Sequence, residues 1–471
     1  MNTEERHILE KALSGLEKAE LVALLLDQAQ RIEKLEGEVS HLGKELQTAL
    51  RAEKRQAAPF RKSEVKENPK PRGRDKGHKG HYRTASGEAT ESAESPLETC
   101  PVCGGQLRDK QPIDQVVEEI PPVRLRIVRL RTWQGHCCRC GEVRSTNPLQ
   151  VGTATGSAKV QLGPGAISWV LKLRHRYGLS VSNSCKLLKD AFGLPLTPGA
   201  VCHMEQRLSR KLQPDYAQLL EQARQAERIH ADETSWYVGG PGHWLWVFAN
   251  DGLTLYEVNP SRGRDVLEKV LGKDFKGTLV SDCLSPYEDF CQHQHKCYAH
   301  HLKAIKDALK VAPQSQFLRV LRRMLRQAII YKGCKEILKP PEYQVLCQHL
   351  ERWADQLLPV TVDEKGKPSL DAQACPFNLL QAEQQVGNRL AKRRKHLFTF
   401  LYHDDVPATN NLAERQLRPA VIQRKISCGN KTAKGAHAWQ VIRSICVSNH
   451  QQQKNFSDSI CQALKRDLLS R

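Results

Sequence analysis

The stretch Ile229-His230-Ala231-Asp232-Glu233-Thr234-Ser235-Trp236 decides the fold, because it has the pattern of a short strand whose apolar part ends at two adjacent carboxylates. Side chains alternate between the two faces of a sheet along a strand. Asp232 and Glu233 are therefore expected on opposite faces, and a metal site built on this strand takes one of them and not the other.

The segments that follow predict a mixed sheet. Residues 228–238, 243–249 and 253–258 are typical of three consecutive strands joined by turns rich in glycine and asparagine. A helix over 263–271 and a buried strand over 277–281 come next. A three-stranded meander followed by helix, strand and helix is the order of a ribonuclease-H-like fold, in which helices cover both faces of a mixed sheet.

Three carboxylates are the candidate catalytic residues. Asp282 ends the fourth strand, which lies beside the first in this fold, so that Asp232 and Asp282 can meet and hold Mg²⁺ or Mn²⁺. A third carboxylate, Glu414, belongs to a helix near the end of the domain. An alternative stays open, because Asn411 followed three residues later by Glu414 is also the pattern of a helix capping box. Basic residues nearby favour a site that holds phosphates beside the metal: Arg415, Arg418, Arg424, Lys425, Lys431 and Lys434.

Two CxxC knuckles predict a zinc ribbon over residues 97–150. Cys100 and Cys103 form the first knuckle, and Cys137 and Cys140 form the second. Four thiolates complete a tetrahedral Zn²⁺ site without an open position, which indicates a structural ion. Residues 123–133 alternate apolar and basic side chains, as the strands of such a ribbon would. The alternative is a set of unpaired core cysteines.

The N-terminal part has two different compositions. Residues 1–51 carry a heptad pattern that predicts a coiled coil, most simply a parallel dimer, although a single amphipathic helix packed on its own domain remains an alternative. Residues 52–96 are rich in lysine, arginine, proline and glycine, which predicts a disordered basic linker able to touch DNA phosphates.

Two helical regions flank the first part of the catalytic domain. In residues 151–226, two helices around a turn at 192–198 have the outline of a helix-turn-helix, a pattern that any helical pair also gives. Residues 303–400 are expected to form a basic helical insertion, which either grips DNA or presents a solvated face.

Charge and cysteine content bound the class of protein. The chain has 471 residues and a formal net charge of +20, which favours a polyanionic partner such as nucleic acid over a merely solvated basic surface. The N-terminus lacks the apolar core of a signal peptide, so the 16 cysteines are expected to be reduced. No apolar run approaches the length of a membrane span, and the expected location is the cytoplasm.

Four motifs together resemble one family. They are Asp232-Glu-Thr, Ser281-Asp282 with Tyr287 shortly after, Cys297-Tyr-Ala-His300, and Thr409-Asn-Asn-Leu-Ala-Glu-Arg-Gln-Leu-Arg-Pro419. They resemble the IS-sixty-six family of bacterial insertion-sequence transposases, over nearly the whole chain and most specifically in the Asn-Asn-x-Ala-Glu-Arg block. In place of that family's usual residues, this chain has Cys283-Leu284 after the second aspartate and His301 after the Cys-x-Ala-His block.

The resemblance implies a function and a set of ligands. Asp232, Asp282 and Glu414 would be a DDE triad that holds two Mg²⁺ or Mn²⁺ ions in a ribonuclease-H-like fold. The protein would bind the terminal inverted repeats of its element, cleave the 3′ strand and join the 3′-OH to target DNA. It would act as a homodimer or larger assembly at the bacterial nucleoid, with accessory proteins of the same element as further partners.

Some alternatives remain open beside this interpretation. Cys297 and His300, with His293 and His295 near, are either a second metal site or, as we favour, a strand end packed on the next helix. The whole chain could instead be a DNA-binding regulator with an inactive catalytic domain, or a ribonuclease-H-like nuclease.

The predicted organisation is a multidomain α/β chain. Its parts are a coiled coil (1–51), a basic linker (52–96), a zinc ribbon (97–150), a helix-turn-helix-like region (151–226), the first part of the catalytic domain (227–302), a helical insertion (303–400), the completion of the catalytic domain (401–450) and a helical tail (451–471).

Overall fold

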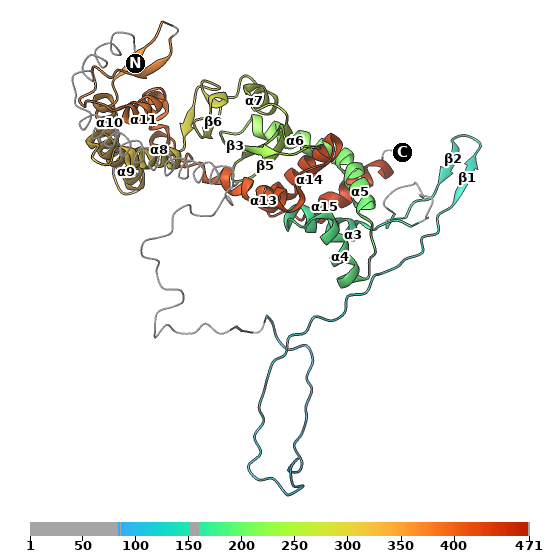
Figure 1. Cartoon of the computed structure of the whole chain (residues 1–471). Coiled ribbons are helices and arrows are strands. Elements are labelled where there is room, and N and C mark those ends of the chain that lie inside the picture. The colour runs from blue at the N-terminus through green and yellow to red at the C-terminus, as the bar shows by residue number, and fades with distance from the viewer. Residues whose placement is uncertain (1–82, 85, 148, 151–159, 365, 470–471) are drawn as a thin grey trace, which may run out of the picture. The chain divides into compact units, whose positions relative to one another are not determined.

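The computed structural model describes residues 83–84, 86–147, 149–150, 160–364 and 366–469 (Figure 1). The chain divides into two units, residues 1–117 and 118–471, and each is described by itself. The predicted coiled coil and most of the predicted linker lie outside the described residues. Residues 83–84 and 86–96 are exposed and carry no helix or strand.

Among the described residues, all named helices and strands lie in the second unit. In chain order they are β1 (Gln134–Cys137), β2 (Gly141–Arg144), α3 (Pro164–Leu171), η1 (Lys172–Arg176), α4 (Val181–Phe192), α5 (Pro198–Lys211), α6 (Gln213–Arg224), β3 (Arg228–Trp236), β4 (His243–Ala249), β5 (Thr254–Asn259), α7 (Arg264–Leu271), β6 (Thr278–Ser281), η2 (Ser285–Tyr287), β7 (Gln294–Lys296), α8 (Tyr298–Val311), α9 (Gln316–Cys334), α10 (Pro340–Leu357), β8 (Val360–Val362), β9 (Pro368–Leu370), α11 (Gln381–Ala391), η3 (Arg394–His396), α12 (Thr399–Tyr402), α13 (Asn411–Ser427), α14 (Ala433–Gln451) and α15 (Phe456–Leu469). None of the helices in the described part of the chain is long and apolar enough to cross a membrane.

The central element is a five-stranded sheet with the order β5-β4-β3-β6-β7. Strands β3, β4 and β5 are antiparallel, as a meander must be, whereas β6 and β7 run parallel to β3. This five-stranded sheet with flanking helices confirms the predicted mixed sheet, and it fits a ribonuclease-H-like domain. The predicted helix over 263–271 and strand over 277–281 are present as α7 and β6.

The two faces of the sheet pack against different hydrophobic cores. On one face of the sheet, Ile229, Ala231 and Trp246 pack with the apolar residues of α7. On the other face, Trp236 and Val247 pack with α13 and α14. Because β3 is covered on both faces, its alternation decides which helix each of its side chains meets.

Side chains of helix α14 accept hydrogen bonds from the outward-facing N–H groups of the edge strand β5. Ser448 Oγ accepts a hydrogen bond from the Thr254 N–H at 3.0 Å, and Ser444 Oγ accepts one from the Tyr256 N–H at 2.9 Å. Gln440 Oε1 accepts a hydrogen bond from the Val258 N–H, the next outward-facing donor of β5. Four residues of helix rise about 6 Å and two residues of strand about 6.8 Å, so side chains at every fourth helical position meet every second strand residue. The edge strand therefore has no row of unpaired donors for another chain to join.

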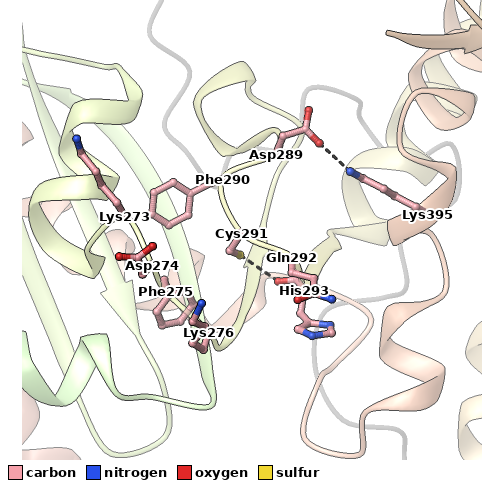
Figure 2. Close-up of a pocket in the computed structure, with 10 residues that line it drawn as sticks. All are labelled: Lys273, Asp274, Phe275, Lys276, Asp289, Phe290, Cys291, Gln292, His293 and Lys395. Carbon is pink, nitrogen blue, oxygen red and sulfur yellow. Dashed lines mark hydrogen bonds and ion pairs between the residues drawn. The ribbon is translucent and has the colours of Figure 1, made fainter. Parts of the chain in front are cut away.

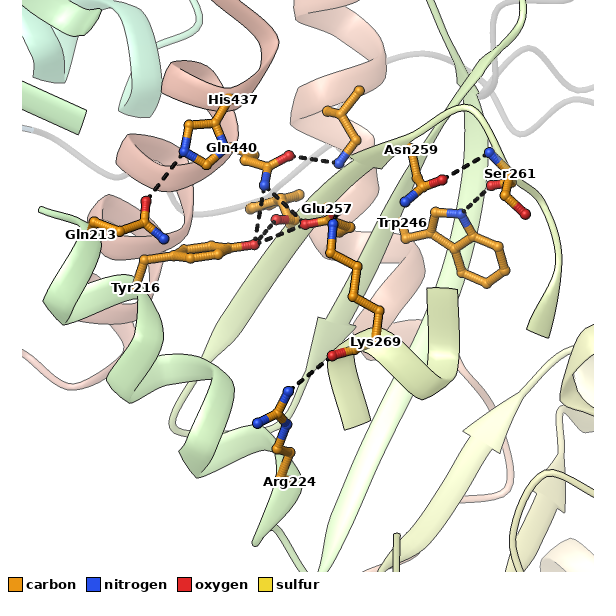
Figure 3. A network of polar contacts seen from close by, with 12 residues as sticks. Gln213, Tyr216, Arg224, Trp246, Glu257, Asn259, Ser261, Lys269, His437 and Gln440 are labelled. Carbon is orange, nitrogen blue, oxygen red and sulfur yellow. Dashed lines mark hydrogen bonds and ion pairs between the residues drawn. The ribbon is translucent and has the colours of Figure 1, made fainter. Parts of the chain in front are cut away.

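A buried carboxylate joins α6, β5 and α14 (Figure 3). Glu257 is 3% exposed, and its Oε2 accepts hydrogen bonds from Tyr216 Oη at 3.2 Å and from Gln440 Nε2 at 2.9 Å. Lys269 on α7 binds the other carboxylate oxygen. The charge is thus paired and fully hydrogen-bonded, as a buried carboxylate requires.

Helices α8 to α11 form one helical group that has its own core (Figure 1). The apolar face of α9 packs inward, because Phe317, Leu318, Leu321 and Leu325 are buried. Helix α9 ends at Cys334, and α10 begins at Pro340.

The helix pair in the 151–226 region is present as α4 and α5. Gly193 ends α4 in the left-handed conformation, at φ 64°. Thr197 caps α5 by accepting a hydrogen bond from the Ala200 N–H at 3.2 Å, and Pro198 is the first helical residue. DNA reading by α5 stays a prediction.

The expected strands over residues 123–133 are wrong. The described strands nearby are β1 and β2, which pair with each other around the second CxxC knuckle, while 123–133 carries no strand. Several of its apolar side chains, Val123, Leu125, Val128 and Leu130, instead line a cavity of about 750 Å³ with Trp169 of α3 and Phe192 of α4. Arg124, Arg126 and Arg129 line the same cavity, and Ile127 is exposed, so the alternation does not sort apolar and basic side chains onto two faces.

Candidate active site

Asp232 and Asp282 stand at the same level of two neighbouring parallel strands. The register places His230 of β3 opposite Val280 of β6, and each aspartate lies two residues further on. Asp232 Oδ1 accepts the Glu233 N–H at 2.9 Å, and Asp282 Oδ1 accepts the Leu284 N–H at 2.9 Å. Each carboxylate is thus oriented by one local backbone bond and keeps its second oxygen for a ligand.

The electrostatics of Asp232 show that the carboxylates are gathered together. Burial raises the pKa of Asp232 well above its usual value, and repulsion from Glu233, Asp282 and Glu414 raises it further. The bond from the Glu233 N–H opposes this rise. A cluster of carboxyl groups without a neutralising cation costs free energy, and a divalent ion removes that cost. The donor set of hard oxygens suits Mg²⁺ or Mn²⁺.

Glu414 is not part of a capping box. Helix α13 begins at Asn411 with Asn410 as its N-cap, so Glu414 is one residue too far along for the capping-box position. The Asn410 side chain makes no cap bond either. The Glu414 carboxylate has no hydrogen-bond or ion-pair partner within the described part of the chain, and it remains available for a cation.

Asn410 ties the start of α13 to the catalytic strand. It is fully buried, its Nδ2 donates to the Ala231 carbonyl at 2.8 Å, and its Oδ1 lies 3.0 Å from His230 Nδ1. Burial lowers the pKa of His230 to about 4, so the ring is neutral and can donate to this oxygen. Through these bonds Asn410 fixes where Glu414 emerges relative to Asp232. Sequence reasoning missed this role, although the Asn-Asn pair was part of the motif.

Glu233 occupies the other face of the sheet, as parity predicted. Its side chain is 2% exposed and is therefore not solvated. Tyr287 Oη donates to Glu233 Oε2 at 2.6 Å, and Arg262 Nη2 donates to Oε1 at 2.8 Å. Burial raises the pKa of Glu233, and these two bonds oppose the rise. Glu233 therefore has a structural role, because it binds Tyr287 and Arg262.

A buried lysine lies behind the carboxylates and was not found from the sequence. Lys296 of β7 is 1% exposed, and its Nζ donates to Ser281 Oγ at 3.0 Å and to the Tyr287 carbonyl at 3.3 Å. Burial lowers the pKa of Lys296 to about 8, and attraction to Cys283 and Asp282 opposes this shift. Its positive charge partly offsets the acidic cluster. A lysine in a three-residue strand gave no sequence signal for this role.

Cys297, His300 and Glu414 come together at the same end of the sheet. Their ligand atoms all lie within 4.8 Å of one another. His295 is fully buried beside Tyr298 and Phe400 and is not part of this group. Burial lowers the pKa of His295 to about 4.

The basic residues predicted to bind DNA divide into two sets. Arg424 is buried and turns inward, where its Nη1 donates to the Ser235 carbonyl and to Ser235 Oγ at 2.8 Å. The other members are exposed on or after α13: Arg415, Arg418, Lys425, Lys431 and Lys434.

The two CxxC knuckles belong to different units, and each has the local form of a thiolate site. Backbone N–H groups of Val102 and Cys103 lower the pKa of Cys100, and those of Arg139 and Cys140 lower that of Cys137. Donation to sulfur favours the thiolate that Zn²⁺ binds. The shared zinc ion itself stays a prediction.

A separate pocket of about 530 Å³ lies at the opposite ends of β6 and β7 (Figure 2). It is lined by residues that precede these strands, including Lys276 and His293, and by Lys395, which pairs with Asp289 at 2.8 Å. Asp282 follows the carboxyl end of β6, so this pocket and the carboxylate cluster lie at opposite ends of the strands.

Comparison with known proteins identifies a family. The family described as "Transposase IS66 family" matches residues 159–438, which include all three carboxylates. The uncharacterized protein y4qI of Sinorhizobium fredii is 22% identical over 284 residues, which cover 53% of this chain and 49% of that protein. The chain thus spans about half the length of this relative. Because the family match covers more than half of this chain, the chain belongs to the IS66 family of transposases.

Proposed function

We propose that this chain is a DDE-type transposase that binds the inverted repeats of its insertion sequence, cleaves the 3′ strand at each end and joins the freed 3′-OH to target DNA. The observation that carries the proposal is the clustering of Asp232, Asp282 and Glu414: burial raises the pKa of Asp232 most, and the charges of Glu233, Asp282 and Glu414 raise it further. A cluster of Asp232 within β3, Asp282 directly after β6 and Glu414 in the first turn of α13 favours a cation site over a structural motif.

The proposed metal ligands have the right chemistry for two Mg²⁺ or Mn²⁺ ions. When bound, such ions activate the attacking oxygen and stabilise the leaving oxygen of an in-line displacement at phosphorus. The charges of both Asp282 and Glu414 act on Asp232, which supports a bridging role for Asp232. Asp282 and Glu414 would complete the two coordination shells.

The remaining residues position these ligands and the DNA. Asn410 holds the start of α13 against β3, and Lys296 offsets negative charge from behind Asp282. The exposed cations Arg415 and Lys425 on α13, with Lys431 and Lys434 after it, would bind phosphates, which fix the position of DNA without reading its sequence. The basic face of α9, with Arg319, Arg323 and Arg326 exposed, would extend this surface.

Several parts of the proposal concern assembly. Residues 1–51 would hold two copies together as a coiled coil, and the ribbon and α5 would contribute to binding of the inverted repeats. The protein would act at the bacterial nucleoid, together with accessory proteins of the same element.

The test is cleavage of a duplex that carries one end of the element. Wild type should nick it only with Mg²⁺ or Mn²⁺ and should join the product to a second duplex, while Asp282→Asn should do neither. Equal activity of Asp282→Asn would contradict the site assignment. Cleavage without joined products would favour a nuclease, and binding without any cleavage would favour a regulator.

A further inference from the structure

We propose that Cys297, His300 and Glu414 bind a divalent transition metal of the zinc class, and that this site and the proposed magnesium site share Glu414. One thiol, one imidazole and one carboxylate lie with their ligand atoms within 4.8 Å of one another. Sulfur and nitrogen donors select zinc-class ions over magnesium. Binding of the ion is independent of the proposed function, whereas the sharing of Glu414 rests on it.

The fold fixes the three donors at one point. Cys297 is the N-cap of α8, and His300 follows in the first turn of that helix, on the same face. Glu414 is in the first turn of α13. The two helix starts are joined, because the backbone N–H of Asn410 donates to Cys297 Sγ at 3.1 Å.

The donors have unused capacity for a ligand. His300 Nδ1 is a buried atom without a hydrogen-bond partner, and the Glu414 carboxylate is likewise unpaired among the residues that the structure describes. The Cys297 thiol is fully buried, and backbone N–H groups already converge on its sulfur. Such donation favours the thiolate once a metal displaces the proton.

The spacing suits an ion that draws the donors together. Zn–S and Zn–N bonds of about 2.3 and 2.0 Å in a tetrahedron place ligand atoms roughly 3.3 to 3.8 Å apart. Separations that are all within 4.8 Å must then close by at most about 1 Å. His300 and Glu414 are partly exposed and can turn by this amount, while Cys297 stays fixed.

Three protein ligands leave a fourth position open, which distinguishes this site from a closed structural one. An ion bound here would occupy Glu414, and it would therefore compete with magnesium for the third carboxylate of the triad. Zinc-class ions bind such mixed donors more tightly than magnesium does. The expected result is inhibition of magnesium-dependent cleavage by zinc.

The first experiment measures metal content and needs no activity. Full-length chains are dialysed against buffered free Zn²⁺ and analysed by mass spectrometry of the metal. Wild type should bind one more equivalent than Cys297→Ser or His300→Gln, because the predicted ribbon ion is common to all. Cys347→Ser and His349→Gln, a buried cysteine and an exposed histidine on α10, are matched controls that should equal wild type.

A spectroscopic measurement identifies the ligand. With Co²⁺ in place of Zn²⁺, the absorption spectrum of wild type minus that of Cys297→Ser should show a thiolate-to-cobalt charge-transfer band. His300→Gln guards against misfolding of the Cys297 variant, because His300 is only partly buried on its helix. Equal zinc content in wild type and His300→Gln would overturn the proposal.

The second experiment tests the sharing of Glu414. At saturating Mg²⁺, Zn²⁺ should inhibit cleavage by wild type, and half-inhibition of His300→Gln should need at least tenfold more Zn²⁺. The same inhibition in both proteins would overturn the sharing but not the extra equivalent of metal. A chain that binds the extra zinc but never cleaves DNA would instead contradict the proposed transposase activity.

Discussion

Tyr287 Oη donates a hydrogen bond to Glu233 Oε2 at 2.6 Å, on the opposite face of the sheet from Asp232. Two adjacent carboxylates on one strand therefore have different surroundings. Asp232 meets other carboxylates, whereas Glu233 meets a phenol and the Arg262 guanidinium. This difference leads to a paired prediction.

Asp232→Asn should abolish cleavage, whereas Glu233→Gln should keep a substantial part of it. Loss of a metal ligand removes several kcal/mol of transition-state stabilisation, which is roughly a hundredfold or more in rate. Glu233→Gln should instead lower the free energy of unfolding by about 1 kcal/mol, since the ion pair with the half-exposed Arg262 weakens. End-cleavage rates and thermal unfolding of both variants are the measurements. The reverse order of activities would mean that β3 faces the other way.

The acidic cluster should make the metal-free protein less stable as the pH rises. The folded-state pKa of Asp232 is raised, so the unfolded chain loses this proton first, from about pH 4 upward. Between that pH and the folded-state pKa, the folded chain binds more protons, and its stability falls with rising pH. Asp232→Asn should lack this decline, and the difference in Tm between the two proteins, measured from pH 4 to pH 8, isolates it from histidine titration.

Magnesium should reverse the effect in wild type alone. An ion that binds only the folded chain stabilises it by about 2.7 kcal/mol at a hundredfold excess over its Kd. The rise in Tm should be larger at pH 8 than at pH 5, because protonated carboxyl groups bind the ion poorly. An equal rise in Asp232→Asn would show that the ion binds elsewhere.

The sheet and the placement of its carboxylates could be predicted because they follow from local pattern. Period-2 alternation identifies the meander, and the strand over 277–281 ends on Asp282, beside Asp232 in a parallel register. Parity alone then assigned Asp232 and Glu233 to different faces.

The remaining features depend on contacts between distant residues, which leave no periodicity. Cys283 and His301, the two places where the sequence departs from the family pattern, lie against each other, with Sγ and Nε2 4.0 Å apart. Lys296 reaches Ser281 only because β6 and β7 pair. The capping-box alternative for Glu414 was equally local, and it is excluded because Asn410, which contacts β3, is the N-cap of α13 in place of Asn411.

Ser444→Ala should destabilise the sheet through its edge strand. The variant leaves the buried Tyr256 N–H without its acceptor, which costs about 1 to 3 kcal/mol. Ser182→Ala is the matched control, since Ser182 lies exposed on α4 and alanine is the better helix former. Chemical denaturation of both should show a loss for Ser444→Ala alone. Equal stability would mean that water replaces the serine at the edge.

Removal of zinc should unfold the ribbon and leave the catalytic domain folded, because the three described hydrophobic cores contain no residue of 97–150. Cys100→Ser should lose one equivalent of zinc without lowering the main unfolding temperature, whereas Cys138→Ser should keep it, since Cys138 is outside the CxxC spacing. Zinc content by metal analysis and unfolding by calorimetry check both statements. Unchanged zinc in Cys100→Ser would contradict the ribbon.

Asn410→Ala should cost both stability and activity, while Asn411→Ala should cost little of either. The first change leaves the Ala231 carbonyl and the His230 ring without partners in a buried site, at about 2 kcal/mol or more. It also frees the start of α13, so Glu414 loses its fixed place and the cleavage rate falls. Asn411 is exposed, and its truncation should change the free energy of unfolding by less than about 0.5 kcal/mol. A capping box would require the opposite order, because its loss at Asn411 would cost about 1 kcal/mol. Unfolding and cleavage measured on the two neighbours thus decide whether Glu414 is held for a metal or for its own helix.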